Sequence, residues 1–427
     1  MSTVESPFRH FPSGPTPVER TRPHLPQAVI DDAAILPPDE LTTQVIPISE
    51  AADYAGEWNA LADRAAEPNP FCRPDFLLPI VAYLQPNNPR LLFIRKKGRL
   101  TGILPLVKDK AGFGLSGKKP ALYYHHYGPV GAPIIDRDLV DETLSALFPP
   151  KPGSSIQSPR KSMRCLPAGL LVHLDENGPI YQSLCRLAEQ YGRTPIVLDR
   201  FQRAALDARQ DRDHFFKHSL MRKKRKDLSR LFRRLQEEGQ VNSFAHRDPS
   251  AIAGALERFI ALEARSWKGR RETALGSESG RTQLALELVN EFAAKDQARI
   301  DEITVDGLLV ASLISFIDCD RLFTWKIAHH EEFARFSPGS QIIVKLSETL
   351  LADPAITFAD SLATPDHPMI DHIWRDRISV VKAYIPLRRP SRLAASCMRA
   401  DERAYGFARA TAKRLITATR SRIKKAR

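Results

Sequence analysis

The sequence predicts an α/β protein in which short strands alternate with amphipathic helices. The strands are indicated by apolar runs joined by tight turns, most clearly at Asp306-Gly307. The helices are indicated by apolar residues on one helical face, as at Leu228, Leu231 and Leu235. At 427 residues, with 43% apolar and 26% charged residues, the chain has an ordinary globular composition and is long enough for two domains.

The first half of the chain begins with a segment that predicts no fold. Residues 1–40 contain eight prolines and no sustained periodicity, which indicates a disordered leader. A folded region is expected from about Thr42. Its expected elements are a helix over 51–65, a hairpin over 90–107, a strand and turn over 123–135, a surface loop over 148–164, a strand over 169–175 and a helix after it.

The second half shows a clearer succession of elements. It opens with a basic helix over 213–239 that Gly239 ends, and Asp248-Pro249 caps a later helix that runs to about Trp267. The other expected elements are a strand over 241–247, a helix over 281–295, a hairpin over 299–318, strands over 321–329, 356–360 and 378–386, a helix after Ser337 and a short helix near 367–374.

Several classes of protein are excluded by composition. The longest nearly apolar run, 308–317, is too short for a membrane span, and the amino terminus lacks the apolar core of a secretory signal. The five cysteines (72, 165, 185, 319 and 397) are scattered without a CxxC pair. Reduced thiols in the cytoplasm are therefore expected, with neither a disulfide framework nor a zinc site.

The positive charge of the chain is concentrated at its carboxyl end. From Leu387 to Arg427 there are 13 Lys or Arg residues against Asp401 and Glu402, a net charge of +11 out of +13 for the whole chain. The rest of the chain, residues 1–386, therefore has a net charge of only about +2 (13 minus 11). The basic character belongs to this tail.

Four stretches of the second half resemble a known family. They are WKG…TAL (267–275), FTWKIA (323–328), SPG (337–339) and DSLATPDHPMIDHIWRDR (360–377). Together with the order of elements, they resemble the GNAT fold and, within it, the CelD-type or cellulose-biosynthesis acetyltransferases. The likeness covers about 210–380, and 42–205 resembles the first module of such proteins more weakly. His329-His330 and Glu272 depart from the family pattern, and SPGS stands where ordinary acetyltransferases have a Q/R-x-x-G-x-G/A loop.

This resemblance implies tandem GNAT-like modules, each with a mixed, largely antiparallel central sheet flanked by helices. The implied organisation is a leader (1–40), an N-terminal module (42–205), a C-terminal acyltransferase domain (210–386) and a basic tail (387–427) that is able to form a helix. The family is related to the Fem-type peptidoglycan aminoacyltransferases, which share this tandem arrangement.

The Ser-Pro-Gly-Ser turn has two interpretations. Ser337 is a good N-cap and Pro338 suits the first helical position, so the turn serves to start a helix. Alternatively, Gly339 lets a ligand approach free amides at the positive end of the helix, where a diphosphate binds well. Under this second interpretation, the amides of Gly339, Ser340 and Gln341 hold the diphosphate of coenzyme A.

The resemblance places catalytic candidates at the ends of two diverging strands. Asp366 or His367 is the preferred base, with Asp orienting His, although both also suit the cap of a short helix. Asp360 either positions the acceptor or closes a turn, and Ser361 beside it is a candidate substrate contact.

Three further residues are candidates on the strand 321–329 and the preceding helix. Lys326 alternates with Trp325, so one is expected to face the core and the other a cleft, with Asp360 or a phosphate as partner of the lysine. A buried ion pair is the alternative for Lys326. Trp267 and Lys268 lie where the acyl site is implied, although a tryptophan there also suits the core.

The function implied is a cytoplasmic, acyl-CoA-dependent acyltransferase, with acetyl-CoA as the expected co-substrate and no metal. The acceptor is an amine or a sugar hydroxyl, and the family links it to exopolysaccharide, cellulose or envelope biosynthesis. Two alternatives stay open: an aminoacyl-tRNA-dependent Fem-like transferase, and a non-catalytic accessory protein of a membrane polysaccharide synthase.

The basic run 222–234 lacks the interleaved aromatic residues of nucleic-acid binding sites. The tail is either a solubilising disordered segment or a helix on the inner membrane surface.

Overall fold

A computed structural model describes residues 41–84, 88–149, 168–219, 222–388 and 392–425. The leader 1–40 and most of the loop 148–164 lie outside these residues. The elements of the first half are β1 (Leu41–Pro47), α1 (Ala55–Ala62), α2 (Pro74–Leu84), β2 (Arg90–Lys96), β3 (Arg99–Asp109), β4 (Lys119–Leu122), β5 (Ile134–Ile135), α3 (Val140–Ser145), β6 (Gly169–Asp175), α4 (Pro179–Gln190) and β7 (Ile196–Asp207).

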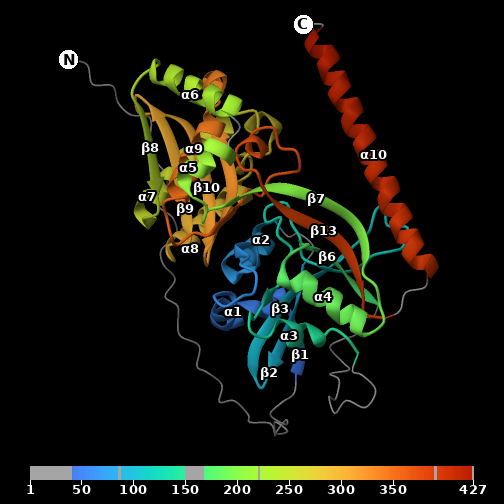
Figure 1. The fold of residues 1–427 in the computed structure, drawn as a ribbon. Coiled ribbons are helices and arrows are strands. Elements are labelled where there is room, and N and C mark those ends of the chain that lie inside the picture. Colours follow the sequence, from blue (N-terminus) through green and yellow to red (C-terminus); the bar gives the residue numbers. More distant parts are fainter. Residues whose placement is uncertain (1–40, 85–87, 150–167, 220–221, 389–391, 426–427) are drawn as a thin grey trace. The chain divides into compact units, whose positions relative to one another are not determined.

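The second half follows the expected succession (Figure 1). Its elements are α5 (Arg212–His214), α6 (Arg222–Gln236), β8 (Val241–His246), α7 (Pro249–Arg265), α8 (Ser279–Ala293), β9 (Ala298–Val305), β10 (Leu308–Asp318), β11 (Arg321–His329), α9 (Pro338–Leu350), β12 (Phe358–Asp360), β13 (Asp376–Pro386) and α10 (Arg392–Lys425). The tail forms a helix, α10, while its expected place on a membrane surface stays a prediction.

The strands of the described residues join in one mixed sheet. Their order is β1-β2-β3-β4-β6-β13-β7-β12-β11-β10-β9-β8, with β5 paired to β3. Only the pairs β4–β6 and β11–β12 run parallel within the described residues. The predicted fold class, a mixed and largely antiparallel α/β arrangement with flanking helices, is therefore confirmed.

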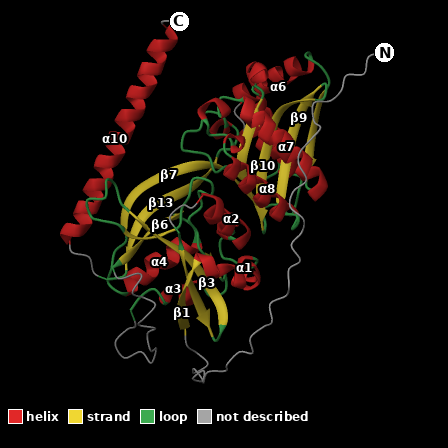
Figure 2. Ribbon diagram, turned by 180° about the vertical axis from the view of Figure 1, so that it is seen from behind, coloured by secondary structure: helices red, strands yellow, loops and turns green. Residues whose placement is uncertain are grey.

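The two halves exchange their last strands at the centre of this sheet. β13, from the end of the second half, pairs with β6, while β7, from the end of the first half, pairs with β12. β7 and β13 also pair with each other along most of their length, from Asp376↔Ala205 to Tyr384↔Ile196. Both figures show these two long strands side by side (Figure 2). The predicted module boundaries, 42–205 and 210–386, stay a prediction, because each half contributes a strand to the other's part of the sheet.

Two apolar clusters cover opposite faces of β9, β10 and β11. On one face, α9 packs its Ile342, Ile343 and Leu346 against Leu313 and other residues of the sheet. On the other face, α7 and α8 pack against Phe316 and Trp325 together with aromatic residues of the first half. Figure 2 shows α7 and α8 on the face turned away from the viewer in Figure 1. A side chain on β11 therefore belongs to one of two chemically separate environments.

Local expectations failed in four places. The helix expected over 213–239 is split into α5, a π-helical turn (Phe215–Ser219) and α6. The aromatic run 123–127 forms no strand beyond an isolated bridge, His125↔Gly128. The strand expected over 356–360 is limited to β12, and the short helix near 367–374 is a 3₁₀ turn, Ile370–His372. Asp248, by contrast, caps α7 as predicted, accepting from the amides of Ser250 and Ala251.

A buried ion pair links the two halves. The Arg73 guanidinium, just before α2, donates to Asp318 Oδ1 at the end of β10 through Nε (2.9 Å) and Nη2 (2.6 Å). Both side chains are almost completely buried. Arg73 Nη2 also contacts Asp63 Oδ1 at 2.9 Å.

We expect Arg73→Ala to lower the free energy of unfolding by about 3–5 kcal/mol, because it leaves the Asp318 carboxylate buried without its partner. Urea denaturation measures this difference. The control is Arg186→Ala, which removes an exposed pair with Asp141 and should cost less than about 1 kcal/mol. Equal losses in the two variants would contradict a special role for the buried pair.

Candidate active site

A β-bulge in β11 determines where its functional side chains point. Ile314 of β10 pairs with Lys326 and Ser315 pairs with Thr324, so Trp325 is the extra residue. Trp325 belongs to the cluster of α7 and α8, and Lys326 places its ammonium over the Tyr127 ring on the same side. As expected, one of the two residues, Trp325, faces the core and the other, Lys326, faces a cleft. The alternation on which the expectation rested is wrong, because the bulge puts both side chains on the same side of the strand.

A cleft of about 570 Å³ opens beside Lys326. It brings together residues from both halves of the chain. Its lining residues are Tyr83, Leu84, His125, His126, Tyr127, Glu263, Trp267, Lys268, Thr273, Glu278, Arg281 and Lys326. Three of the predicted site residues, Trp267, Lys268 and Lys326, thus share one cleft.

Within the described residues, Lys326 forms no ion pair, although the Glu263 carboxylate lines the same cleft. Its Nζ is 4.3 Å from the centre of the Tyr127 ring, a cation–π distance. Burial lowers the pKa of Lys326 to about 8. The negative charge of Glu263 opposes this effect, while the positive charges of Lys268 and Arg281 add to it. The predicted partner Asp360 is engaged elsewhere, so this part of the expectation is wrong. A lysine of this kind is partly neutral near physiological pH and is able to accept a proton.

Lys268 is held rigidly by a buried carboxylate. Its Nζ donates to Glu263 Oε1 (2.8 Å) and to the carbonyl of Ile327 on β11 (2.8 Å). Glu263 also accepts from the Leu275 amide at 2.8 Å. This network joins the end of α7 to β11 and leaves Lys268 little freedom to contact a substrate.

Trp267 is the exposed member of the cleft. Its side chain is 43% exposed, and the Arg271 guanidinium lies 4.9 Å from its ring. The Trp267 amide donates to Glu331 Oε1 at 2.6 Å. The structure therefore places Trp267 at the wall of the cleft rather than in the core.

Three consecutive rings of the first half form the opposite wall. His125 stacks with Tyr127 at 5.7 Å between ring centres, and His126 lies 4.1 Å from His125. Burial lowers the pKa of His125 to about 4 and also lowers that of His126, so both imidazoles are neutral at physiological pH. The Tyr127 carbonyl accepts a hydrogen bond from Trp325 Nε1 at 2.8 Å, which anchors this wall to β11.

The sequence analysis did not assign a function to this wall. Its residues His125, His126 and Tyr127 lie in the stretch YYHHYGPVG, which was interpreted only as a strand and turn. Glu263 was also missed. The sequence did contain one signal for this wall: several tyrosine and histidine rings follow one another in a segment without helical or strand periodicity. Such a segment is typical of a functional loop.

The N-terminus of α9 lies on the other face of β11. Pro338 occupies the first helical position as predicted, but Ser337 adopts a left-handed conformation (φ 54°) and its side chain makes no capping hydrogen bond. The expectation that Ser337 caps through its hydroxyl is therefore wrong. The amides of Ser340 and Gln341 donate to the Ser337 carbonyl at 2.9 and 3.1 Å. Of the three amides expected to hold a diphosphate, only that of Gly339 has no hydrogen-bond partner in the described structure.

Gly339 is packed against the turn that contains His367. A Cβ atom at Gly339 would lie 3.0 Å from Met369 Sδ and 4.0 Å from His329 Nδ1. Ser340 and Gln341 are buried, and Gln341 Nε2 donates to the Leu228 carbonyl of α6 at 3.0 Å. The fit to a diphosphate is thus partial: one free amide and the positive end of a 13-residue helix are present, and Met369 occupies the space beside them.

The predicted bases lie on this second face or at the sheet centre. His367 is half-buried, its Nδ1 accepts from the Met369 amide at 3.4 Å, and burial lowers its pKa. Asp366 is exposed, and no contact between its carboxylate and His367 is present among the described residues. The predicted orientation of His by Asp stays without support.

Asp360 is part of a buried ion pair. Its Oδ2 accepts from Arg203 Nη2 of β7 at 2.5 Å, and its Oδ1 accepts from the Leu362 amide at 2.9 Å. Ser361 is buried beside it, and its carbonyl accepts from Thr324 Oγ1 at 2.7 Å. Both residues therefore fix the point where β12 ends and separates from β11.

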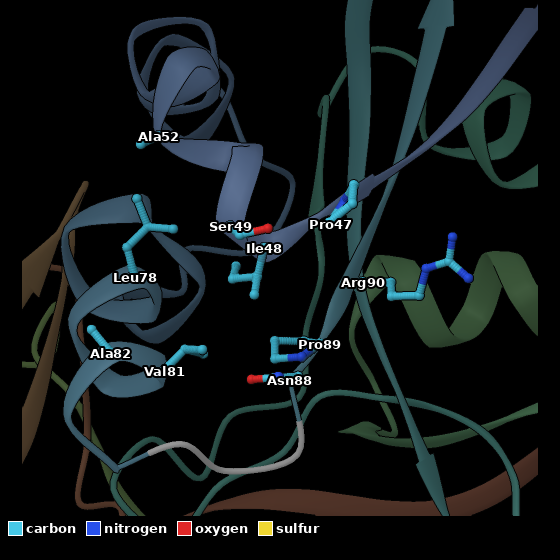
Figure 3. A pocket seen from close by; sticks show the side chains of 10 residues that line it. All are labelled: Pro47, Ile48, Ser49, Ala52, Leu78, Val81, Ala82, Asn88, Pro89 and Arg90. Carbon is cyan, nitrogen blue, oxygen red and sulfur yellow. The ribbon is translucent and has the colours of Figure 1, made fainter.

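Three further hollows lie in the described chain, and Asp360 is the predicted catalytic residue that lines one of them. One hollow, of about 970 Å³, lies between the end of β1 and α2 and is lined mainly by apolar side chains such as Ile48, Leu78 and Val81 (Figure 3). Asp360 lines a small internal cavity of about 40 Å³ with Glu67, whose pKa burial raises to about 7. Within the described residues, no group of three or more His, Cys, Asp or Glu side chains is arranged to bind a metal.

The lowered pKa of Lys326 has a consequence for stability. The folded state holds a proton on Lys326 less strongly than the unfolded state, where the ordinary pKa is 10.5. The unfolded state therefore binds more protons between about pH 8 and 10.5, and stability attributable to this group rises with pH across that window. Below about pH 8, Lys326 is charged in both states, so the full cost of burying its ammonium lowers the stability of the fold.

We expect Lys326→Met to raise the free energy of unfolding at pH 7 by about 2–3 kcal/mol and to remove this pH dependence. Chemical denaturation at pH 7 and at pH 10 measures both effects. The exposed Lys108, changed to Met, serves as the control and should alter stability by less than about 0.5 kcal/mol. An unchanged or lowered stability of Lys326→Met at pH 7 would show that the ammonium is adequately solvated.

Comparisons with known proteins give a family for part of the chain. Residues 222–365 match the model of the acetyltransferase (GNAT) domain family. A search of curated protein sequences gives no significant match. No helix in the described part of the chain is both long enough and apolar enough to cross a membrane.

The chain is similar in structure to several solved proteins. It is similar to FemX (TM-score 0.50, 10% identity, covering 77% of this chain and 95% of FemX). It is also similar to the C-terminal domain of a putative lysylphosphatidylglycerol synthetase from Agrobacterium fabrum (TM-score 0.47, 11% identity, covering 81% and 94%). A third is a tandem GNAT protein from the clavulanic acid biosynthesis pathway (TM-score 0.39, 14% identity, covering 82% and 100%). At these identities the likeness is one of fold, and residues 222–365 are the part of this chain that matches a GNAT acetyltransferase domain.

Proposed function

We propose that the protein transfers an acyl group from acyl-CoA to an amine or a sugar hydroxyl held in the cleft beside Lys326. The observation that carries the proposal is the position of two consecutive residues of β11. Ile327 packs toward the cluster of α9, while Lys326 turns into the cleft. A donor at the N-terminus of α9 and an acceptor in the cleft would then meet at the edge of β11 beyond Phe323, where β12 no longer pairs with it.

The donor side is supported by charge as well as by the free Gly339 amide. The guanidinium groups of Arg335 and Arg234 lie 4.7 and 6.0 Å from the ring of Phe336, the residue just before Ser337 and α9. Arg335 also pairs with Glu238 at the surface, Nη2 to Oε1 at 3.0 Å. Arginine at this place favours a diphosphate or a phosphorylated nucleoside. Acyl-CoA, when bound, supplies the activated thioester carbonyl. The chain's own task there is to orient that carbonyl toward β11.

Two features of the cleft support its use as the acceptor site: a base, Lys326, and the wall of uncharged rings formed by residues 125–127. Lys326, in its neutral form, takes the proton from the attacking amine or hydroxyl, and the rings of His125 and Tyr127 exclude water on one side. Lys268 is a positioning residue, because its ammonium ties the Ile327 carbonyl to Glu263. His367 is the rival base, from the opposite face of β11.

The acceptor class and the cellular role rest on the resemblance to CelD-type acetyltransferases. This resemblance favours acetyl-CoA as the donor, action in the cytoplasm and a place in exopolysaccharide or envelope biosynthesis. Three cationic side chains and two carboxylates line the cleft. This excess of positive charge favours an acceptor that is neutral or anionic over one with several positive charges.

A second candidate function is aminoacyl transfer from tRNA, which uses an ester in place of the thioester. The observation that favours it is the position of α6, whose Leu228 carbonyl binds Gln341 of α9. Lys223, Lys226 and Arg233 on α6 are exposed, so a polyanion bound at α9 would meet these charges. The cleft and Lys326 would serve the same purpose in both reactions.

The base is tested by kinetics. We expect Lys326→Ala to lower kcat by about 10²- to 10⁴-fold, the usual contribution of general base catalysis, without changing the affinity for the donor. The wild-type rate should rise with pH through about 8, because only the neutral amine accepts a proton, and this rise should vanish in the variant. Thiol release from acetyl-CoA, with a set of amine and sugar acceptors, is the measurement.

His367→Ala is the decisive comparison in the same assay. A large loss of kcat in His367→Ala with an active Lys326→Ala would move the role of base to His367. Thiol release that neither substitution reduces would reject both assignments.

The donor site is tested by binding. We expect Gly339→Ala to weaken the affinity for coenzyme A about tenfold, because the new methyl group displaces Met369 toward the free amide. Titration calorimetry with coenzyme A measures this at equilibrium. Gly406→Ala is the matched control, since a Cβ there meets no atom within 4 Å.

The same titrations separate the two candidate functions. Binding of tRNA that weakens steeply with salt, with no binding of coenzyme A, would replace the first function by the second. An affinity for coenzyme A that Gly339→Ala leaves unchanged would remove α9 as the donor site.

A further inference from the structure

The C-terminal helix α10 is anchored by the only two acidic residues of the basic tail. The Asp401 carboxylate accepts hydrogen bonds from the amides of Phe113, Gly114 and Leu115 at 3.0, 3.1 and 2.9 Å. Glu402 accepts from the Gly112 amide at 2.6 Å and pairs with Lys382 of β13 at 2.7 Å. These contacts leave neither carboxylate facing solvent.

The loop that receives α10 is shaped for close approach. Gly112 has φ 54°, and a Cβ atom there would lie 2.6 Å from the Asp401 backbone. Ala395 and Met398 of α10 are buried in a cluster with Tyr384 of β13. This part of α10 is therefore fixed in rotation against the sheet, so the side chains on its other face have a defined outward direction.

The outward face of α10 carries apolar side chains. At 100° per residue, Leu393, Ala400, Ala404 and Phe407 fall within about 60° of one another and about 120–180° away from the buried Ala395 and Glu402. The side chains of Leu393 and Phe407 are 74% and 76% exposed. An apolar stripe that the fold leaves uncovered, along a docked helix, is typical of a binding surface.

One flank of the stripe carries positive charge. Arg399 and Arg403 are exposed and lie on one flank of Leu393 and Phe407. In sequence, residues 403–427 contain nine Lys or Arg residues and no Asp or Glu. A surface that combines exposed leucine and phenylalanine with this charge complements an anionic, partly apolar partner.

We propose that the outward face of α10, defined by Leu393, Ala400, Ala404 and Phe407, binds the surface of an anionic phospholipid bilayer. Helices with an apolar stripe and basic flanks lie in the interface of such bilayers. An acidic protein or a nucleic acid would use the arginines, but it would not require two large apolar side chains separated by four helical turns on a convex helix. The proposal is independent of the acyltransferase function.

The experiment is co-sedimentation of the full-length protein with vesicles of phosphatidylcholine alone and of phosphatidylcholine mixed equally with phosphatidylglycerol. We expect binding to the anionic vesicles only, weaker at high salt because screening shortens the reach of the arginines. Leu393→Ala with Phe407→Ala should lower the partition coefficient about tenfold or more, since apolar area no longer enters the interface. Because both side chains are exposed, the variant should fold as the wild type does.

The matched control is Phe244→Ala on β8, whose side chain is 48% exposed and lies outside α10. It should bind vesicles as the wild type does. Equal binding to both kinds of vesicle, or anionic binding that the double variant leaves unchanged, would overturn the proposal. Binding to RNA or to polyglutamate, with no binding to anionic vesicles, would replace the bilayer with a polyanion.

Discussion

The exchange of β7 and β13 is the constraint on which the rest of the structure depends. Because β13 inserts between β6 and β7, neither half completes its part of the sheet alone. The sheet is therefore continuous from β1 to β8, and loops of the first half are held at fixed positions over strands of the second. The Tyr127 carbonyl and Trp325 Nε1 meet across this junction in a buried hydrogen bond. A cleft lined by both halves follows from this continuity rather than from a loose contact between separate domains.

Buried charges reinforce the junction at two places. The pairs Arg73–Asp318 and Arg203–Asp360 each join one residue of the first half to one of the second, and all four side chains are almost completely buried. Burying such pairs contributes little net stability, but a misregistered junction would leave each charge alone in a low dielectric. Their effect is therefore to select one register of the exchanged strands. Lys326 forms no such ion pair in the described part of the chain, and burial lowers its pKa.

The sequence predicted elements well where the pattern was local and poorly where long-range pairing decided the outcome. The hairpin of β9 and β10 and the capped helix α7 depend on turn and cap residues that are adjacent in sequence. β7 was missed because charged residues, the exposed Arg200 and the buried Arg203 among them, interrupt its apolar run. Only the pairing with β13 makes it a strand. The partner of Asp360 was missed for the same reason, since Arg203 lies 157 positions away in sequence. Three of the predicted site residues share one cleft, while the ring wall 125–127 showed no periodic pattern in the sequence.

The bulge at Trp325 explains why one strand is able to serve two faces. In a regular strand, successive side chains point to opposite faces of the sheet. With Trp325 packed on the face of α7 and α8, Lys326 would then point to the opposite face, into the cluster beneath α9. A charged ammonium there would be surrounded by Ile342, Ile343 and Leu346, at a large desolvation cost. The extra residue places Trp325 and Lys326 on the same side and returns Ile327 to the apolar face. Because β12 pairs with β11 only as far as Phe323, this occurs where β11 has already lost its parallel neighbour. The backbone can therefore bulge without breaking a second ladder, and a polar group reaches the cleft with apolar packing intact on both sides.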